Sequence, residues 1–338
     1  MGLIVGAYAM AHFLVDFACA FVVLRIGAPT AAQALCVLVY NFCAFALQMP
    51  FGLLADRLNR NAWVAVLGCL LVAAAFGLSA LPLALAVTAG VGNALFHVGG
   101  GVDVMNLSDG RSGALGLFVS PGALGLYCGL LLSRNLAVCA RWPVVAVLGA
   151  ALLLCAVKRG AAGAFVPNAP VSLAPLGDPR VRLAALLLFA VVVLRAYVGL
   201  VQAFPWKAQG QWALLLTLAL VLGKAAGGVL RDRLGALRVS VSSLGASAVL
   251  VALSAFPLPG LGAVLLFNMS MPVTLWALAR LLPGAKGFSF GLLTFALFLG
   301  YVPASLGAVP QTFLPGFFAA STLLSLALLW AALREARL

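Results

Sequence analysis

Asp16 is a carboxylate inside a long apolar stretch, and two other polar side chains share its face. His12 and Tyr8 precede it by four and eight positions, so a helix here carries all three on one side. A charge near the centre of a bilayer costs at least about 2.5 kcal/mol, so it needs a partner or a wet cavity. A carboxylate in such a cavity can load and release a proton. We expect Asp16 to couple protons, with His12 tuning or sharing the proton; the alternative is an aspartate that only joins helices by hydrogen bonds.

Arg195 is a second charge within an apolar stretch. It precedes Asp232 by 37 positions, while Asp16 precedes Asp56 by 40, and the two later aspartates belong to a repeated motif. Arg195 and Asp16 therefore fall at nearly matched depths in repeat-related segments. A guanidinium is a permanent charge with a forked donor set that suits carboxylate or phosphate. We expect Arg195 to bind an anionic or zwitterionic substrate; a structural ion pair with Asp16 is the alternative.

Other polar side chains recur in the apolar stretches at helical spacing. Asn93 and His97 are one turn apart, and Asn41 and Gln48 are two turns apart. Such faces could line a path for a solute, although a hydrogen bond between helices is the commoner role. The predicted substrate-binding residues are Arg195, Asn93, His97, Tyr8, Asn41, Gln48, Tyr197, Gln202 and Asn268.

Composition places these residues in a membrane protein. Hydrophobic residues make up 65% of the 338 positions and charged residues 8%, whereas a soluble domain is about a quarter charged. Apolar runs of about twenty residues recur from end to end, and a helix of that length crosses a hydrocarbon core about 30 Å thick. Barrel strands would instead show short alternating segments. The sequence predicts an all-α integral membrane protein.

Turn residues and charges divide the chain into about twelve transmembrane helices. Prolines and basic residues concentrate in 159–181, which indicates a cytoplasmic linker. We therefore expect an N-terminal six-helix bundle over 1–158 and a C-terminal six-helix bundle over 182–338. The predicted spans are 2–24, 30–54, 62–80, 83–106, 113–133, 142–158, 182–204, 211–230, 239–256, 260–282, 288–308 and 314–333.

The basic residues lie in the connectors, mostly on one side of the predicted membrane. Fourteen of the 20 Lys and Arg fall on the side that carries the start of the chain, and four fall on the other: Arg25, Arg134, Arg141 and Lys207. Because basic loops stay in the cytoplasm, both termini are expected there. The net charge of +13 thus reflects topology rather than a nucleic-acid site. We expect a multi-pass, monomeric protein of the bacterial inner membrane.

A short charged motif occurs once in each half of the chain. It runs Gly-Leu-Leu-Ala-Asp-Arg-Leu-Asn-Arg over 52–60 and Gly-Val-Leu-Arg-Asp-Arg-Leu-Gly over 228–235, with its aspartates 176 positions apart. This spacing indicates a duplicated bundle. The aspartates can accept hydrogen bonds from helix amino ends and from arginines, and so latch the cytoplasmic side; solvated loop charges are the alternative. The predicted gating residues are Asp56, Arg57, Arg60, Asp109, Arg111, Asp232 and Arg233.

The repeated motif resembles the loop between the second and third helices of the major facilitator superfamily. Asn59 replaces the second glycine of the family pattern and Arg231 replaces a small residue, while both aspartates are kept. Asparagine is the next most willing residue after glycine to adopt positive φ. The resemblance implies two six-helix bundles around a central cavity, alternating access, and a secondary transporter.

A second resemblance is local. Residues 92–100, with Asn93 and His97, are similar to the fourth helix of fosmidomycin-resistance-type exporters, and 116–125 to their fifth. Val98 stands where that group commonly has proline, and Ser120-Pro121 replaces its Gly-Pro pair. This resemblance favours export.

These features favour a proton-coupled secondary transporter that exports a small charged or amphipathic organic solute. Import of an organic anion by proton symport is the near alternative, which Arg195 supports. An enzyme using His97 and Asp103 is disfavoured because the loops hold no clustered nucleophile, base or metal ligands. A membrane assembly factor that transports nothing is a third class. We do not expect this protein to be an enzyme.

We expect no cofactor and no metal site. The seven cysteines all precede position 160 and lack the close pairing of a metal or redox motif, so we assign them no chemistry. The driving force would be a transmembrane proton gradient; sodium is the alternative, since Asp16 and Asn41 offer oxygen ligands. The expected partners are a small-molecule substrate and the lipid bilayer.

Overall fold

The computed structural model describes residues 1–26, 31–135, 137–306 and 313–338. Within these ranges the chain is helical and forms no β-strand. Eleven of the described segments are long and apolar enough to cross a membrane, and a twelfth apolar helix, Ala236–Ala252, is shorter at 17 residues. The predicted all-α membrane architecture with about twelve helices is therefore confirmed.

The predicted spans lie close to the observed helices. The first predicted span, 2–24, coincides with Gly2–Leu24, and the second is observed as Ala31–Leu58. Residue 30 of that span, and residues 307 and 308 of the span predicted over 288–308, lie outside the described residues. The positions of the helices are predictable because the apolar runs are long and uninterrupted.

The chain forms two compact units. The first contains Met1–Asp109, Pro121–Val171 and Gly284–Phe295, and the second contains Gly110–Ser120, Ser172–Pro283 and Ala296–Leu338. Two short segments, 110–120 and 284–295, are thus grouped with residues that are distant in the sequence. The division into bundles over 1–158 and 182–338 stays a prediction.

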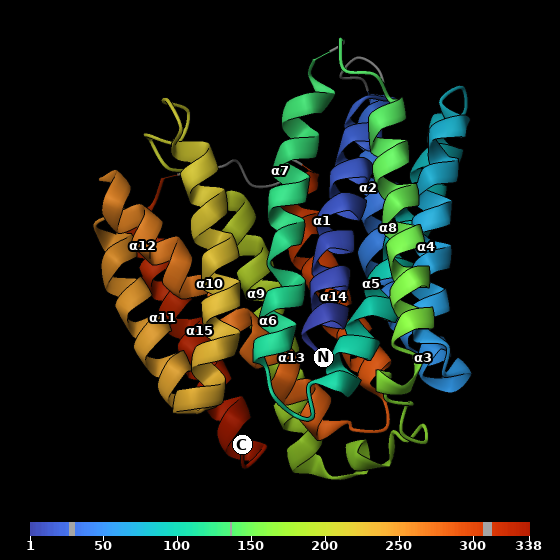
Figure 1. The fold of residues 1–338 in the computed structure, drawn as a ribbon. Helices are drawn as coiled ribbons and strands as arrows, with labels where there is room; N and C mark the ends of the chain where they lie inside the picture. The colour runs from blue at the N-terminus through green and yellow to red at the C-terminus, as the bar shows by residue number, and fades with distance from the viewer. Residues whose placement is uncertain (27–30, 136, 307–312) are drawn as a thin grey trace. The chain divides into compact units, whose positions relative to one another are not determined.

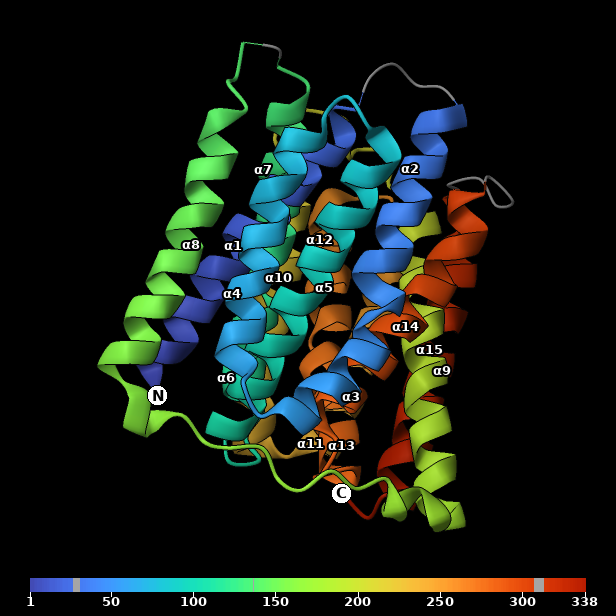
Figure 2. The same cartoon turned by 90° about the vertical axis from the view of Figure 1, so that its right-hand side faces the viewer.

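In the first unit, α1 packs against α5, α7 and α8, while α4 packs against α5 and α8 (Figures 1 and 2). The helices α2 and α3 also lie against α5, so α5 is in contact with most of this unit. The helices are α1 (Gly2–Leu24), α2 (Ala31–Asn41), α3 (Gln48–Leu58), α4 (Asn61–Ala75), α5 (Pro82–Leu107), α7 (Pro121–Ser133), α8 (Arg141–Gly160) and the first part of α14 (Lys286–Ser305).

In the second unit, α11 packs against α12 and α15, α10 packs against α6 and α12, and α9 packs against α13 and α15. The helices are α6 (Gly113–Val119), α9 (Pro179–Val201), α10 (Trp212–Leu234), α11 (Ala236–Ala252), α12 (Pro257–Asn268), α13 (Ser270–Leu281), the rest of α14 and α15 (Pro315–Glu335).

Glycines on α7 bring this helix close to α1. A Cβ at Gly125 would meet the carbonyl oxygen of Phe13, and a Cβ at Gly129 would meet that of Phe17. Small residues four apart let helix backbones approach where lipid provides no hydrophobic drive for association. This approach holds the face of α1 that carries Asp16 against α7.

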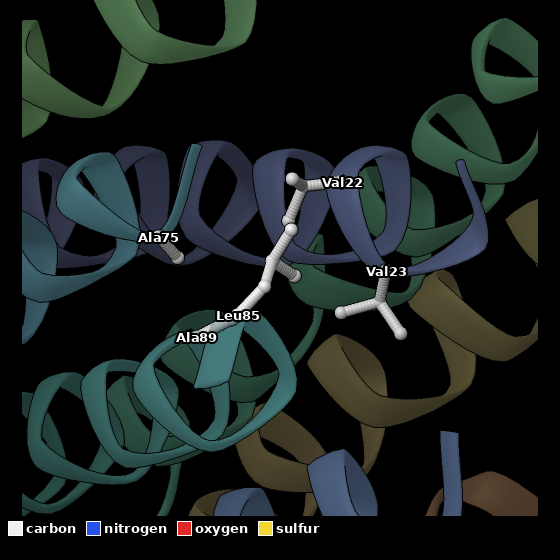
Figure 3. Close-up of a cluster of buried hydrophobic side chains, with 5 residues drawn as sticks. All are labelled: Val22, Val23, Ala75, Leu85 and Ala89. Atoms are coloured by element: carbon white, nitrogen blue, oxygen red, sulfur yellow. The ribbon is translucent and has the colours of Figure 1, made fainter. Parts of the chain in front are cut away.

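Apolar side chains fill the space between α1, α4 and α5. Val22, Val23, Ala75, Leu85 and Ala89 form a buried cluster (Figure 3). Tyr40 and Phe76 are among the half-buried side chains that pack on it. This packing sets the register of α1 against α5, which positions the polar residues one to three turns earlier on α1 and later on α5.

Candidate functional site

Four predicted site residues come together in the first unit. His12 Nε2 lies 3.2 Å from Asp16 Oδ2, and His97 Nε2 lies 2.8 Å from His12 Nε2 and 3.7 Å from Asp16 Oδ1. The Nδ2 group of Asn93 donates to Asp16 Oδ1 at 3.0 Å. We call His12, Asp16, Asn93 and His97 the α1–α5 cluster. The predicted proton-coupling pair and two predicted substrate residues therefore form one hydrogen-bonded group.

The backbone determines how the hydrogens of this cluster are arranged. His97 Nδ1 lies 2.9 Å from the carbonyl oxygen of Asn93, one turn earlier on α5. A carbonyl only accepts, so His97 Nδ1 carries a hydrogen, and in neutral His97 the Nε2 atom is the acceptor. In that state His12 Nε2 can donate to His97 Nε2. The α1–α5 cluster is thus a continuous path along which a hydrogen can move between imidazoles and carboxylate.

The Tyr8 hydroxyl bonds to a different carboxylate, although the helical spacing places Tyr8 on the same face of α1 as Asp16. Its hydroxyl donates to Asp103 Oδ2 at 2.6 Å, and Asn61 Nδ2 donates to Asp103 Oδ1 at 2.9 Å. Asp103 is 4% exposed, so both carboxylate oxygens are satisfied inside the protein. Tyr8 belongs to a second polar group one turn nearer the start of α1.

Asn168 extends this second group into the segment that follows α8. Its Nδ2 donates to the carbonyl oxygens of Ala55 and Asp56 at 2.9 and 3.2 Å, and its Oδ1 accepts from Asn61 and Asn106 at 2.7 and 2.8 Å. The sequence did not indicate this role, because a proline-rich connector has neither helical periodicity nor a motif that would single out one asparagine.

A cavity of about 260 Å³ lies beside this second group. Asn61 and Asp103 line it from α4 and α5, and Lys158 and Phe165 line it from the end of α8 and the connector that follows. The Lys158 ammonium lies 3.9 Å from the centre of the Phe165 ring. The predicted gating residue Arg60 also lines this cavity, which places it next to the connector.

Asn41 and Gln48 lie around a local break in the second span. Residues Phe42–Ala46 form one π-helical turn between α2 and α3. Asn41 Nδ2 donates to the carbonyl of Val37, and Gln48 Nε2 donates to that of Ala44 at 2.5 Å. Gln48 is fully buried, and its Oε1 has no hydrogen-bond partner in the part of the chain that the structure describes. π-Helical turns occur often at functional sites. The substrate role of Gln48 stays a prediction.

Arg195 is the most unusual side chain of the second unit. It is 9% exposed, and its buried Nε and Nη1 have no hydrogen-bond partner among the described residues. Its guanidinium carbon lies 5.5 Å from the centre of the Phe267 ring. A buried guanidinium with unsatisfied donors is costly, so this position suits an anionic partner.

The remaining predicted substrate residues of the second unit are unremarkable. Asn268 Nδ2 donates to the carbonyl of Val264 on its own helix at 2.8 Å. Tyr197 is half-buried on α9, and Gln202 follows the last residue of that helix. Whether Arg195 and Asp16 face each other, as the sequence suggested, stays a prediction.

Asp56 caps the amino end of α14. Its Oδ1 accepts from the backbone N–H of Gly287 at 2.8 Å, and its Oδ2 accepts from that of Phe288 at 2.9 Å. The two backbones approach closely here, because a Cβ at Gly52 would meet the carbonyl oxygen of Gly287. The expected contact between this aspartate and a helix amino end is present; the gating role stays a prediction.

Asp232 makes the repeat-related contact in the second unit. It accepts from the backbone N–H groups of Ser112 and Gly113 at 2.7 and 2.8 Å, at the start of α6. Arg231 Nη1 donates to it at 2.9 Å, and the Arg231 guanidinium carbon lies 3.2 Å from the centre of the Trp276 ring. The sequence marked Arg231 only as a departure from the family pattern and did not indicate Trp276.

The other predicted gating residues lie in the turns beside these aspartates. Arg57 and Arg60 flank Asn59, whose φ of 51° is the positive value that the sequence indicated for it. Asp109 also has a positive φ, 48°, in the turn between α5 and α6. Of the rest, Arg111 follows this turn and Arg233 lies in the last turn of α10.

Comparison with known proteins identifies the fold. No known family profile and no curated protein matches the sequence. The structure is similar to a human organic anion transporter (TM-score 0.72, 17% identity, 97% of this chain and 99% of that one). It is similar to the E. coli fucose:proton symporter, a major facilitator superfamily transporter, in its outward conformation (TM-score 0.69, 15% identity, 98% of this chain and 97% of that one). It is also similar to a bacterial homologue of the iron transporter ferroportin (0.63, 18%, 99% and 98%). The chain therefore has the major facilitator fold.

Proposed function

We propose that this protein is a secondary active transporter that exports a small charged or amphipathic organic solute across the cytoplasmic membrane by alternating access, coupled to protons. The observation that carries this proposal is the α1–α5 cluster, in which a carboxylate and two imidazoles are hydrogen-bonded inside a helical bundle. The major facilitator fold and the solute transporters that share it support the transport function.

In this proposal Asp16 and His12 hold the coupling proton. His12 Nε2 can pass a hydrogen either to Asp16 or to His97, since both acceptors lie within 3.2 Å. Asn93 orients the carboxylate and the His97 ring together. A proton taken from one side of the membrane and released to the other would drive the solute. One structural neighbour is a fucose:proton symporter, a transporter named for coupling of this kind.

The outward direction is supported by the likeness of residues 92–100 to the fourth helix of fosmidomycin-resistance-type exporters. Asp56 and Asp232 would then hold the cytoplasmic side closed through the amino ends of α14 and α6, with the neighbouring arginines and Asp109 assisting. Both termini would lie in the cytoplasm of a bacterial cell, and the working unit would be a monomer.

Proteoliposomes test this function. Purified protein is reconstituted and screened with candidate solutes, with and without an imposed proton gradient or sodium gradient. Wild-type protein is expected to move a solute in response to the proton gradient. Asp16→Asn is expected to lose gradient-driven flux but to keep solute exchange in the absence of a gradient, because only the proton carrier is removed.

The matched control is Asp178→Asn. Asp178 accepts from Arg180 N at the start of α9, and asparagine is an equally good cap there, so both activities should stay at the wild-type level. Unchanged gradient-driven flux in Asp16→Asn, or a response to sodium alone, would overturn the proton-coupling assignment.

Arg195 favours a second candidate function, import of an organic anion by proton symport. Its unsatisfied buried donors suit a carboxylate or phosphate group, and a structural neighbour is named as an organic anion transporter. Arg195→Gln is expected to abolish uptake of anionic solutes, while Arg195→Lys retains a small fraction of it. Export of a cationic solute that Arg195→Gln leaves unchanged would contradict this candidate.

A further inference from the structure

Three side chains of the types that bind transition metals meet in the first unit. His12 and Asp16 come from adjacent turns of α1, and His97 comes from α5. One ligand atom from each residue lies within 4.8 Å of the other two. Two imidazoles and one carboxylate are a donor set that suits Zn²⁺, Fe²⁺, Co²⁺ or Ni²⁺, whereas Mg²⁺ and Ca²⁺ prefer oxygen ligands alone.

The separations of these atoms are close to those that a metal ion requires. Bonds of about 2.0–2.2 Å to nitrogen and oxygen at tetrahedral angles put ligand atoms about 3.3 Å apart. The observed separations are 2.8 Å between the two Nε2 atoms, 3.2 Å from His12 to Asp16, and 3.7 Å from His97 to Asp16. Side-chain shifts of a few tenths of an ångström would therefore admit an ion.

Asn93 supplies the outer hydrogen bonds that such a site needs. Metal-binding histidines usually donate their other ring N–H to a carbonyl or carboxylate, which fixes the ring and directs the remaining nitrogen at the ion. His97 Nδ1 makes this bond to the Asn93 carbonyl oxygen at 2.9 Å, so its Nε2 lone pair is directed at His12 and Asp16. The Asn93 side chain holds Asp16 Oδ1 at 3.0 Å.

Gly122 leaves room beside the ligand atoms. A Cβ at this position of α7 would contact both His12 Nε2 and Asp16 Oδ2. Any larger residue would place its side chain against the ligand atoms of His12 and Asp16. The glycine is thus a second feature, on a third helix, that suits this place to an ion.

We propose that His12, Asp16 and His97 bind one divalent transition-metal ion, with Zn²⁺ as the representative. On binding, His12 carries its hydrogen on Nδ1 instead of Nε2, so two neutral imidazoles and one carboxylate face the ion. The fourth coordination position is left for water or a solute group. The ion binds the same His12 and Asp16 atoms that hold the coupling proton, so it inhibits proton-driven flux. The inhibition rests on the proposed function; the binding does not.

Binding is tested on the full-length protein in detergent. Zn²⁺ titration by calorimetry is expected to show one ion per chain, and Co²⁺ is expected to give visible absorption bands without the near-ultraviolet charge-transfer band of a thiolate ligand. His12→Gln, Asp16→Asn and His97→Gln should each weaken Zn²⁺ binding at least tenfold. Cys139→Ser, which removes an exposed thiol, should not.

A glycine pair tests the site without removing a ligand. Gly122→Ala retains all three ligands but fills the adjacent space, so it should weaken Zn²⁺ binding at least tenfold. Gly149→Ala on α8 is the matched control, because a Cβ there meets nothing within 4 Å, and it should bind Zn²⁺ like the wild type.

The proposal is overturned if no Zn²⁺ binds, if binding survives the ligand variants, or if Cys139→Ser removes it. Binding that requires the three ligands, in a protein that moves no solute, supports the metal site and sinks the proposed function. Proton-driven flux in a protein that binds no metal supports the proposed function and contradicts the metal site.

Discussion

His12 and His97, 85 positions apart in the sequence, place their Nε2 atoms 2.8 Å from each other. The sequence suggested a proton-coupling role for the first and a substrate role for the second. Their contact couples the two residues, since neither ring can change its hydrogen-bonding state without affecting the other. Changes at either residue should therefore be coupled rather than additive.

The cap that Asp56 provides should stabilise the first unit. Asp56→Ala leaves the backbone N–H groups of Gly287 and Phe288 without their acceptors, and loss of such a cap costs about 0.5–2 kcal/mol. Asp56→Asn keeps one acceptor oxygen and should lose less. Thermal unfolding in detergent measures the order wild type, Asn, Ala, and equal stability of all three would contradict it.

The close approach of α3 and α14 requires a glycine. Gly52→Ala forces a methyl group against the carbonyl oxygen of Gly287, so the helices must separate and the melting temperature should fall. Gly6→Ala on α1 meets nothing within 4 Å. As alanine favours a helix by about 1 kcal/mol over glycine, this control should be neutral or slightly stabilising. A stable Gly52→Ala protein would show that the contact is not needed.

The connector after α8 should depend on one side chain. Asn168→Ala removes the bonds to the carbonyls of Ala55 and Asp56 and to Asn61 and Asn106. Limited digestion with trypsin should then cleave after Arg159 several times faster. Ser172→Ala is the control, because its hydroxyl only accepts from Ala174 N nearby. Equal cleavage of both variants would rule out a role for Asn168 in holding the connector.

Tyr8 should contribute to stability rather than to proton movement. Tyr8→Phe removes a 2.6 Å hydrogen bond to buried Asp103, and a bond to a charged acceptor is worth about 1.5–3 kcal/mol. Denaturant titration in detergent should show this loss, while proton dependence of flux is unchanged. Tyr127→Phe on α7, at a half-buried position, is the comparison. A shifted proton dependence in Tyr8→Phe would instead place Tyr8 in the coupling machinery.

Membrane location and helical form were decided by the sequence alone. Runs of apolar residues long enough to cross the bilayer permit only helices, and charges at their ends mark the turns, so the predicted spans lie close to the helices. The repeated aspartates were recognisable because their motif recurs 176 positions later. Helical spacing also placed Asp16 and His12 on a common face.

Tertiary structure decided which polar residues are partners. Helical spacing grouped Tyr8 with Asp16. Packing of α1 against α5 instead brings the Tyr8 hydroxyl to Asp103, and it brings Asp16 to Asn93 and His97. Periodicity reports only which face of a helix a residue occupies. The neighbour of that face is set by how backbones approach, as at Gly122, and by segments such as the one carrying Asn168 that have no periodicity at all. Contacts between residues far apart in the chain arise from packing, and no local pattern encodes them.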